Sequence, residues 1–205
     1  MEEPVDEIDP TALLREARSG NVRAISRLLE HYRPYFAMLA RLRASRRLQA
    51  KYDDSDLVQE TLALVQRDLP DFRGTTEAEL TAWLQRIMAS VSGKHMRHYS
   101  RQRRDASLEH QIVDEFCQSS QMLGRVLIAS DTSPSDKSIK RERAVILSRA
   151  LTQLPADYRE ALIMNRLEGL TIAQTAERMG RSPDSVQKLL ARGLLELRRR
   201  LEDQL

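Results

Sequence analysis

The chain has 205 residues, enough for one large domain or two small ones with real hydrophobic cores. Charged residues make up 31% of it and aromatic residues only 4%, and Leu, Ala, Arg and Glu are abundant, which is typical of an all-α protein. The single cysteine, Cys117, excludes an intramolecular disulfide and a thiolate metal site. The acidic start lacks the apolar core of a signal peptide, and no apolar run approaches the roughly twenty residues of a membrane span. We therefore expect a cytoplasmic protein without a membrane segment.

Two helices are predicted first along the chain. Asp9 or Thr11 can cap a first helix over residues 11–19, which Gly and Asn then end. Apolar residues recur at three- and four-residue steps over 22–44 and predict a longer second helix. Pro34 lies inside that pattern and should kink or split the second helix.

Two further helices follow in the first half of the chain. The run Asp-Asp-Ser at 53–55 offers N-caps for a helix that reads DLVQETLALVQRDL and ends at Pro70. A loop with a turn at Gly74 follows it. Apolar spacing then predicts a helix over residues 77–104, with Trp83 in its buried stripe.

The end of that helix is the most basic part of the chain. Residues 94–104 read KHMRHYSRQRR and contain no acidic residue. The positive charges of this helix end repel one another, which favours a polyanionic partner such as nucleic acid. The alternative is a solvated helix face, which is what most charge runs are. His95 and His98 have no third ligand at a suitable spacing, so we expect no metal site there.

Composition changes over residues 105–140, which lack a long apolar period and contain Ser-, Thr- and Pro-rich stretches. This segment is predicted to be a linker, with room for a short helix over 108–116. Helices are expected again over 139–151 and from Pro155 to Gly169.

A helix-turn-helix is predicted over residues 171–200. Ala176, Gly180 and Val186 have the spacing of such a motif, in which a small residue allows close helix approach, glycine takes the positive φ of the turn and an apolar residue fixes the second helix. Thr171 with Gln174 forms a capping-box pattern at the first helix. An ordinary helical hairpin would show a similar short pattern, but the second helix also has a polar or small exposed face.

The second helix of this motif would place its N-terminal turns in a DNA major groove. Our candidates for contact with duplex DNA are Ser182, Asp184, Ser185, Gln187, Lys188 and Arg192.

The order of these motifs resembles a known family. The strings DSDLVQETL, DFRG and AWLQRI before a basic helix end, followed by LPADYREALIMNRLEGLTIAQTAERMG and ARGLLELRRRL, are similar to bacterial RNA polymerase sigma factors of the extracytoplasmic-function (ECF) class of the sigma-70 family. The resemblance covers about residues 25–104 and 145–201, and the second block is the more specific.

The resemblance implies an all-α protein of two small helical domains joined by a linker. Residues 1–104 would form a region 2-like domain, 105–140 the linker, and 141–205 a region 4-like helix-turn-helix domain. Such a protein binds polymerase core and directs promoter-specific initiation. The first domain would capture the single-stranded −10 element and the second would read the −35 element as duplex.

Site residues carry over from the family's motifs. In the family the DLVQETL helix binds the clamp of the polymerase β′ subunit, which here implies Asp56, Gln59 and Glu60. The −10 element would be contacted by the loop and the helix that follow. The candidates there are Phe72, Arg73, Arg97, Tyr99, Arg101 and Arg104, although Phe72 could equally be a core residue.

Three positions depart from the family's pattern. Ser90 stands where Asn is common after the Trp-Leu segment, Lys94 where Asp is common one turn later, and Ser185 where Thr usually precedes Val. These departures concern the details of base recognition.

Two other kinds of protein remain as alternatives. A free-standing helix-turn-helix regulator would bind duplex DNA without polymerase, usually at a symmetric site. An enzyme would need a catalytic constellation, whereas the dense carboxylates Asp53, Asp54 and Asp56 are explained by helix capping. We therefore expect no enzymatic activity and no cofactor, with polymerase core and promoter DNA as partners. The sequence leaves open an anti-sigma factor as a further partner.

Overall fold

The computed structural model describes residues 9–46, 53–99, 114, 118–119 and 137–202, and all its elements within these residues are helices. The first group consists of α1 (Pro10–Arg18), α2 (Val22–Arg46), α3 (Asp54–Asp68), the 3-10 turn η1 (Leu69–Asp71) and α4 (Glu77–Tyr99). The second group consists of α6 (Lys137–Thr152), α7 (Ala156–Leu162), the π-helical turn η2 (Ile163–Leu167), α8 (Ile172–Met179) and α9 (Pro183–Glu202). The all-α prediction is confirmed.

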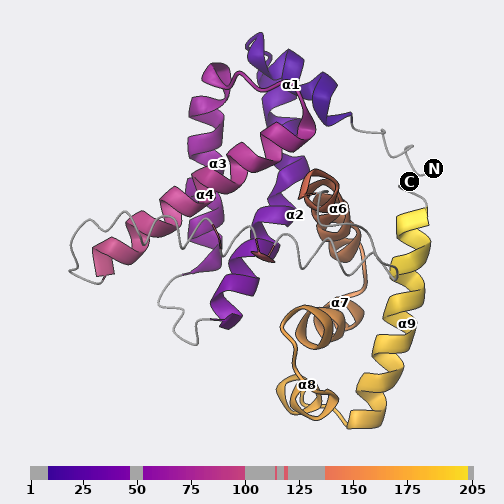
Figure 1. Cartoon of the computed structure of the whole chain (residues 1–205). Helices are drawn as coiled ribbons and strands as arrows, with labels where there is room; N and C mark the ends of the chain where they lie inside the picture. The colour runs from indigo at the N-terminus through magenta and orange to yellow at the C-terminus, as the bar shows by residue number, and fades with distance from the viewer. Residues whose placement is uncertain (1–8, 47–52, 100–113, 115–117, 120–136, 203–205) are drawn as a thin grey trace.

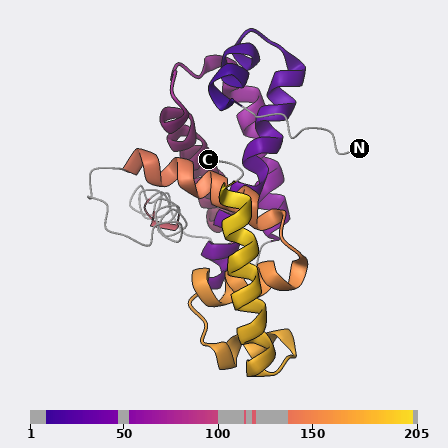
Figure 2. The ribbon, with the colours of Figure 1, turned by 90° about the vertical axis from the view of Figure 1, so that its right-hand side faces the viewer.

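The two groups lie one above the other (Figure 1), with α1 at the upper end and α8 and the start of α9 at the lower end in both views (Figures 1 and 2). Helix α2 is central to the first group, since it packs against α1, α3 and α6. Helix α6, the first of the second group, packs against α2 and α4 of the first group as well as against α9 of its own. We name α1–α4 the N-terminal bundle and α7–α9 the helix-turn-helix unit.

Aromatic side chains of α2 form the centre of the bundle core. Tyr32, Tyr35 and Phe36 are at most 1% exposed, and Leu39 is fully buried. The hydroxyl of Tyr35 is nevertheless satisfied, because it accepts a hydrogen bond of 2.5 Å from Gln85 Nε2 of α4. Such a partner removes most of the cost of burying a polar atom.

Pro34 does not split α2, which runs as one helix from Val22 to Arg46. Proline removes one backbone hydrogen bond and disfavours the helix locally. Here buried side chains lie on both sides of it, with Tyr32 two residues before the proline and Tyr35 directly after it. Tertiary packing on both sides of Pro34 therefore keeps the helix whole.

The predicted helix starts are confirmed where they depend on local caps. Asp9 caps α1, accepting a hydrogen bond of 2.8 Å from Thr11 N, and Asp53 caps α3, accepting one of 2.9 Å from Ser55 N. Most of the predicted linker lies outside the described residues, as does the short helix predicted over 108–116 except for Asp114. None of the described helices is both long and apolar enough to cross a membrane.

His31 of α2 is a buried titratable residue in this core. Its side chain is 6% exposed and lies edge-on to Tyr32, with the ring centroids 5.0 Å apart. Its Nδ1 has no hydrogen-bond partner among the described residues. Burial, with a smaller effect of the positive Arg149, lowers the pKa of His31 from 6.5 to about 4.

We expect this histidine to make the fold acid-sensitive. The unfolded chain takes up a proton on His31 near pH 6.5 and the folded chain only near pH 4, so stability is complete above about pH 6.5 and falls as the pH drops toward 4. The two pKa values, 6.5 and about 4, give an expected loss of unfolding free energy of about 3 kcal/mol. Urea denaturation of the wild type and of His31→Leu at several pH values measures it, and equal pH dependence of the two proteins would contradict the assignment.

Candidate nucleic-acid and protein interfaces

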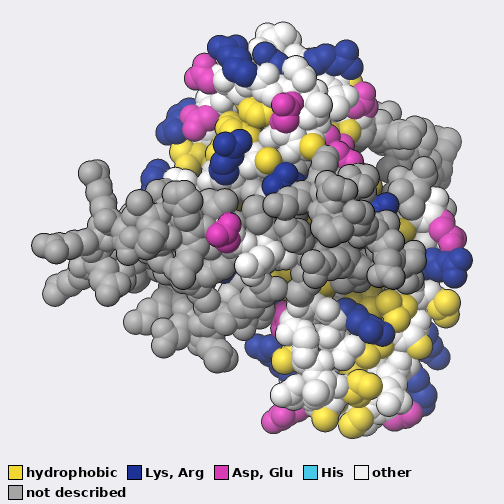
Figure 3. All heavy atoms as spheres, in the orientation of Figure 1, with side chains coloured by type: hydrophobic (Ala, Val, Ile, Leu, Met, Phe, Trp, Pro, Cys, Tyr) yellow, Lys and Arg dark blue, Asp and Glu magenta, His cyan; other side chains and the backbone are white. Residues whose placement is uncertain are grey.

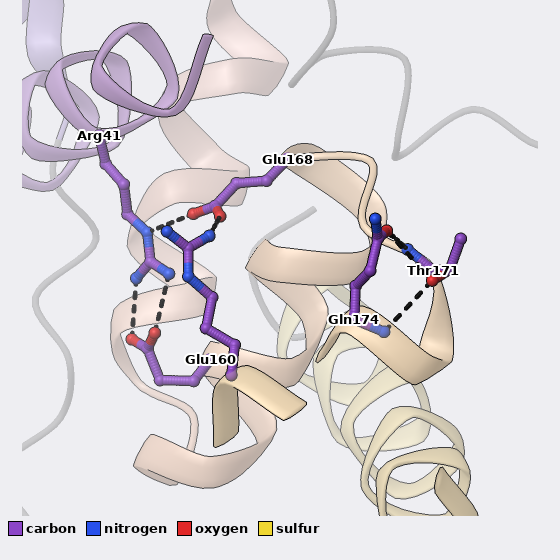
Figure 4. Close-up of polar contacts among 6 residues, drawn as sticks. Arg41, Glu160, Glu168, Thr171 and Gln174 are labelled. Carbon is purple, nitrogen blue, oxygen red and sulfur yellow. Dashed lines mark hydrogen bonds and ion pairs between the residues drawn. The ribbon is translucent and has the colours of Figure 1, made fainter. Parts of the chain in front are cut away.

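The helix-turn-helix is built as its sequence pattern predicts. Thr171 Oγ1 accepts a hydrogen bond of 3.2 Å from Gln174 N, and Gln174 Oε1 accepts one of 2.9 Å from Thr171 N, which completes a capping box at α8 (Figure 4). Gly180 ends α8 in the left-handed conformation, with φ 62° and ψ 34°. Ala176 and Val186 are both at most 2% exposed. The predicted turn is therefore confirmed.

Helix α9 begins at the predicted place. Ser182 Oγ accepts a hydrogen bond of 3.2 Å from Ser185 N, and Pro183 is the first helical residue. Further along α9, Gly193 allows this helix to lie close to α7. A Cβ at this position would lie 3.2 Å from Tyr158 Cβ and 3.2 Å from Leu162 Cδ1. Sequence reasoning missed this contact, since a glycine inside a helix gives no sign of which helix it approaches.

The predicted duplex-reading residues lie on one exposed stretch of α9. Ser182, Asp184, Gln187, Lys188 and Arg192 are exposed and Ser185 is partly exposed. Lys188 Nζ lies 2.7 Å from Asp184 Oδ2, but both side chains are more than 60% exposed, so this pair is weak and easily exchanged for a phosphate contact. Lys and Arg side chains also follow the outer edge of α9 on the right of Figure 3.

A second polar face lies on α3. Asp56 and Gln59 are exposed, while Leu57, Val58 and Thr61 pack into the bundle. Glu60 is partly exposed, and its carboxylate contacts Nε2 of His95 on α4. Because residues at i, i+3 and i+4 share a helix face, Asp56, Gln59 and Glu60 form one polar surface.

The loop between η1 and α4 is held from several sides. Glu79 Oε2 accepts hydrogen bonds from the backbone nitrogens of Thr75 (2.9 Å) and Thr76 (3.1 Å), and these bonds lower the pKa of Glu79. Glu79 N donates in return to Thr76 Oγ1 at 3.2 Å. This capping box was missed, although the Thr-x-x-Glu pattern that signals it is present in the sequence. Arg18 Nη1 also donates to the carbonyl of Gly74 at 3.4 Å.

Phe72 and Trp83 pack together beneath this loop. Phe72 is 8% exposed, and its ring centroid lies 4.9 Å from that of Trp83, which packs against the core as expected. Gly74 allows this arrangement, since a Cβ there would lie 2.3 Å from the Phe72 ring. The structure thus places Phe72 in the core, one of the two places considered for it.

Arg73 of the same loop is exposed. Arg97 and Tyr99 belong to the last turns of α4, but their side chains lie outside what the structure describes. Arg101 and Arg104 lie outside the described residues. Within the parts of the chain that are described, no three His, Cys, Asp or Glu side chains gather as a metal site would require.

Comparison with known proteins agrees with this geometry. A family model described as Sigma-70, region 4 matches residues 144–197, from α6 into α9. The ECF RNA polymerase sigma factor ShbA of Streptomyces griseus is 26% identical over 197 residues, which cover 91% of this chain and 92% of that protein. The ECF RNA polymerase sigma-E factor of Haemophilus influenzae is 25% identical over 85% of each chain.

Two further matches extend the comparison. The ECF RNA polymerase sigma factor SigM of Mycobacterium tuberculosis is 25% identical over 92% of this chain and 83% of its own. A solved structure of CnrH in complex with the cytosolic domain of CnrY aligns with 96% of this chain and 100% of its own at 23% identity, but its TM-score of 0.36 is too low to support an argument.

A helix-turn-helix unit beside a helical bundle is an arrangement found in DNA-binding proteins. The region 4 match and these relatives support an ECF-class RNA polymerase sigma factor of the sigma-70 family. The comparisons thus support a sigma factor that directs transcription, and the names of its relatives state RNA polymerase as the enzyme that they serve.

The packing of Phe72 over Gly74 gives a test of the loop. In Gly74→Ala the new methyl group collides with the Phe72 ring, so we expect a loss of stability of about 1–3 kcal/mol. Trp83 is the only tryptophan, and its fluorescence should shift to longer wavelength as Phe72 leaves it. Thr75→Ala, at an exposed position in the same loop, serves as the control. A variant with wild-type stability and fluorescence would show that the ring moves aside freely.

Proposed function

We propose that this sigma factor binds polymerase core and recognises two promoter elements through separate modules. Residues 1–104 act as the region 2-like domain, 105–140 as the linker, and 141–205 as the region 4-like domain. The proposal is carried by the capped helix-turn-helix, whose second helix, α9, starts after Ser182 and presents an exposed polar face. The protein would act in the cytoplasm, together with the polymerase.

The polymerase contact is assigned to the polar surface of Asp56, Gln59 and Glu60. An acidic and amide-bearing face suits a basic helix such as the family's β′ clamp. The buried side of α3 fixes this face rigidly, because Leu57 and Val58 are at most 6% exposed. Charged contacts at the rim of such an interface set its register and its association rate more than its affinity.

The −10 element is assigned to the loop after η1 and the basic end of α4. Arg73 is exposed at the loop, and Arg97, Arg101 and Arg104 would follow the phosphates of the opened strand. Tyr99 is the better candidate for stacking on an unpaired base, since Phe72 is held by Trp83. One such stacking contact contributes about 1–3 kcal/mol, enough to offset unstacking of a base.

The −35 element is assigned to the start of α9. A recognition helix reads base edges in the major groove with its N-terminal residues, which here are Asp184, Ser185, Gln187 and Lys188. Arg192, one turn further on, suits a phosphate contact. Of this set, Lys188 and Arg192 carry the positive charge on which salt dependence relies.

Transcription in vitro tests the whole proposal. Bacterial core polymerase on a pool of native promoter fragments should produce transcripts only when the purified protein is added. Glu60→Arg reverses the charge of the polymerase-facing surface and should abolish these transcripts and the pull-down of core. Glu16→Arg, at an exposed position of α1, is the matched control and should behave as wild type.

If the protein retards duplex DNA in a gel without polymerase and never directs core polymerase to initiate, it acts as a free-standing helix-turn-helix regulator instead. Normal core binding by Glu60→Arg would remove the α3 assignment while leaving the remainder of the proposal in place.

Lys188→Ala and Arg192→Ala test the groove-facing surface. Each loses one cationic contact, so the slope of log affinity against log salt for upstream-element duplex should fall by about one unit. Competition binding across a salt series measures the slope, and Arg23→Ala on α2 is the control. Unchanged slopes in both α9 variants would refute this assignment.

A further inference from the structure

One residue of the proposed polymerase-binding surface is held by a side chain from another helix. The carboxylate of Glu60 on α3 contacts Nε2 of His95 on α4, 35 residues further along the chain. An ionised carboxylate only accepts hydrogen bonds, so this contact requires that Nε2 of the imidazole carries a proton and donates it. Asp56 and Gln59, which complete the surface, are exposed and have no such side-chain partner within the described part of the chain.

The contact leaves Glu60 accessible to a partner molecule. Its side chain is 43% exposed, whereas that of His95 is 22% exposed. The two oxygens of a carboxylate offer about four positions to donors, and the ring of His95 occupies one of them. A basic side chain of a partner can therefore bind the same carboxylate while His95 still holds it.

Both residues extend from helix turns that are packed in the N-terminal bundle. Next to Glu60, Thr61 is fully buried, and its Oγ1 donates a hydrogen bond of 2.7 Å to the carbonyl of Leu57. Four residues before His95, Val91 is also fully buried. Residues four apart lie on the same side of a helix, so His95 extends from a packed side of α4. The backbone at both ends of the contact is therefore fixed by the core.

An imidazole is well suited to hold this carboxylate. A protonated Nε2 donates a hydrogen bond whether the ring as a whole is neutral or charged. The imidazole also has fewer rotatable bonds than Lys or Arg, so it loses less conformational freedom when it is held in place. Its neighbour Lys94 is exposed, whereas His95 is partly buried against Glu60. The start of the basic run 94–104 thus includes one residue that faces the bundle.

A carboxylate that is already oriented binds a partner more tightly than a mobile one. A free glutamate on a surface samples several rotamers and loses this freedom when a partner orders it. Prior fixation removes that cost, which strengthens binding by about two- to tenfold for one such side chain. The gain concerns the affinity for the partner and not the activity of the complex once it has formed.

We propose that His95 is a positioning residue of the polymerase-binding surface, which holds the Glu60 carboxylate in place for a basic helix of core polymerase. This inference rests on the proposed function of α3. His95 does not touch polymerase in this arrangement but acts through Glu60. Its role is thus distinct from that of the arginines further along the basic run, which are assigned to the opened DNA strand.

Binding of the full-length protein to bacterial core polymerase tests this role. His95→Ala should weaken core binding about two- to tenfold. His95→Gln, whose side-chain amide can donate in place of Nε2, should restore most of the wild-type affinity. At saturating protein, His95→Ala should give the wild-type level of transcripts, because only formation of the complex is affected. Lys94→Ala, at the exposed neighbouring position, is the matched control and should bind core as the wild type does.

A double-mutant cycle shows whether His95 acts through Glu60. Glu60→Ala alone should weaken core binding, and adding His95→Ala to it should cause no further loss. Additive losses would overturn the proposal, since His95 would then act independently of Glu60. Binding by His95→Gln as weak as that by His95→Ala would overturn it as well, because the hydrogen bond would then have no effect. His95→Phe, which keeps a ring but no donor, replaces His95→Ala if circular dichroism shows that the latter is unfolded.

The contact can also be measured without polymerase. Nitrogen NMR spectra of imidazole groups show which ring nitrogen carries a proton, and Glu60→Ala should change the signals of His95, which are assigned by their loss in His95→Gln. Unchanged signals would overturn the contact and the proposal with it. Failure of the wild-type protein to bind core would refute the proposed function of α3. The spectra of the free protein distinguish that result from absence of the contact.

Discussion

Helix α2 must be buried over a broad arc of its circumference, and this requirement organises the molecule. Five of its apolar side chains are at most 2% exposed, namely Leu28, Tyr32, Phe36, Leu39 and Leu42. A helix with so wide an apolar surface cannot be covered by one neighbour. It is covered by α1, α3 and α6 together, so a helix from the distant C-terminal half completes the core of the N-terminal bundle.

The polar surfaces follow from this burial. With one side of α3 packed on α2, Asp56 and Gln59 are left in solvent. With Phe72 tied to Trp83 on α4, Arg73 is left at the outside of its loop. The same division occurs in α9, where Val186 and Leu190 face inward and Lys188 outward. Each candidate interface is the outer side of a helix or loop whose inner side is fixed by packing.

The sequence was sufficient where structure depends on neighbours along the chain. Asp9, Asp53 and Thr171 cap helices because their partners lie two or three residues away. The sequence was insufficient where contacts between residues far apart in the chain determine the structure. A split at Pro34 was a reasonable local expectation, but burial of the flanking turns overrides it. The ion pairs of Arg41 with two glutamates of the helix-turn-helix unit (Figure 4) join residues 119 and 127 positions apart, which no periodicity could indicate. The roles of the site residues remain predictions, since burial and exposure show only where each residue is available.

Gly193 has a consequence for how such a factor can change over time. It sets how closely α9 approaches α7, while Gln187, Lys188 and Arg192 extend into solvent. Under the proposed function, substitutions at the exposed positions would alter the DNA sequence that the helix reads without moving the helix. Duplicated copies of a chain with that function could therefore acquire distinct promoter preferences by few changes, with the fold left intact. The same separation lets an engineer redirect the factor to a new promoter by altering only the outer side of α9.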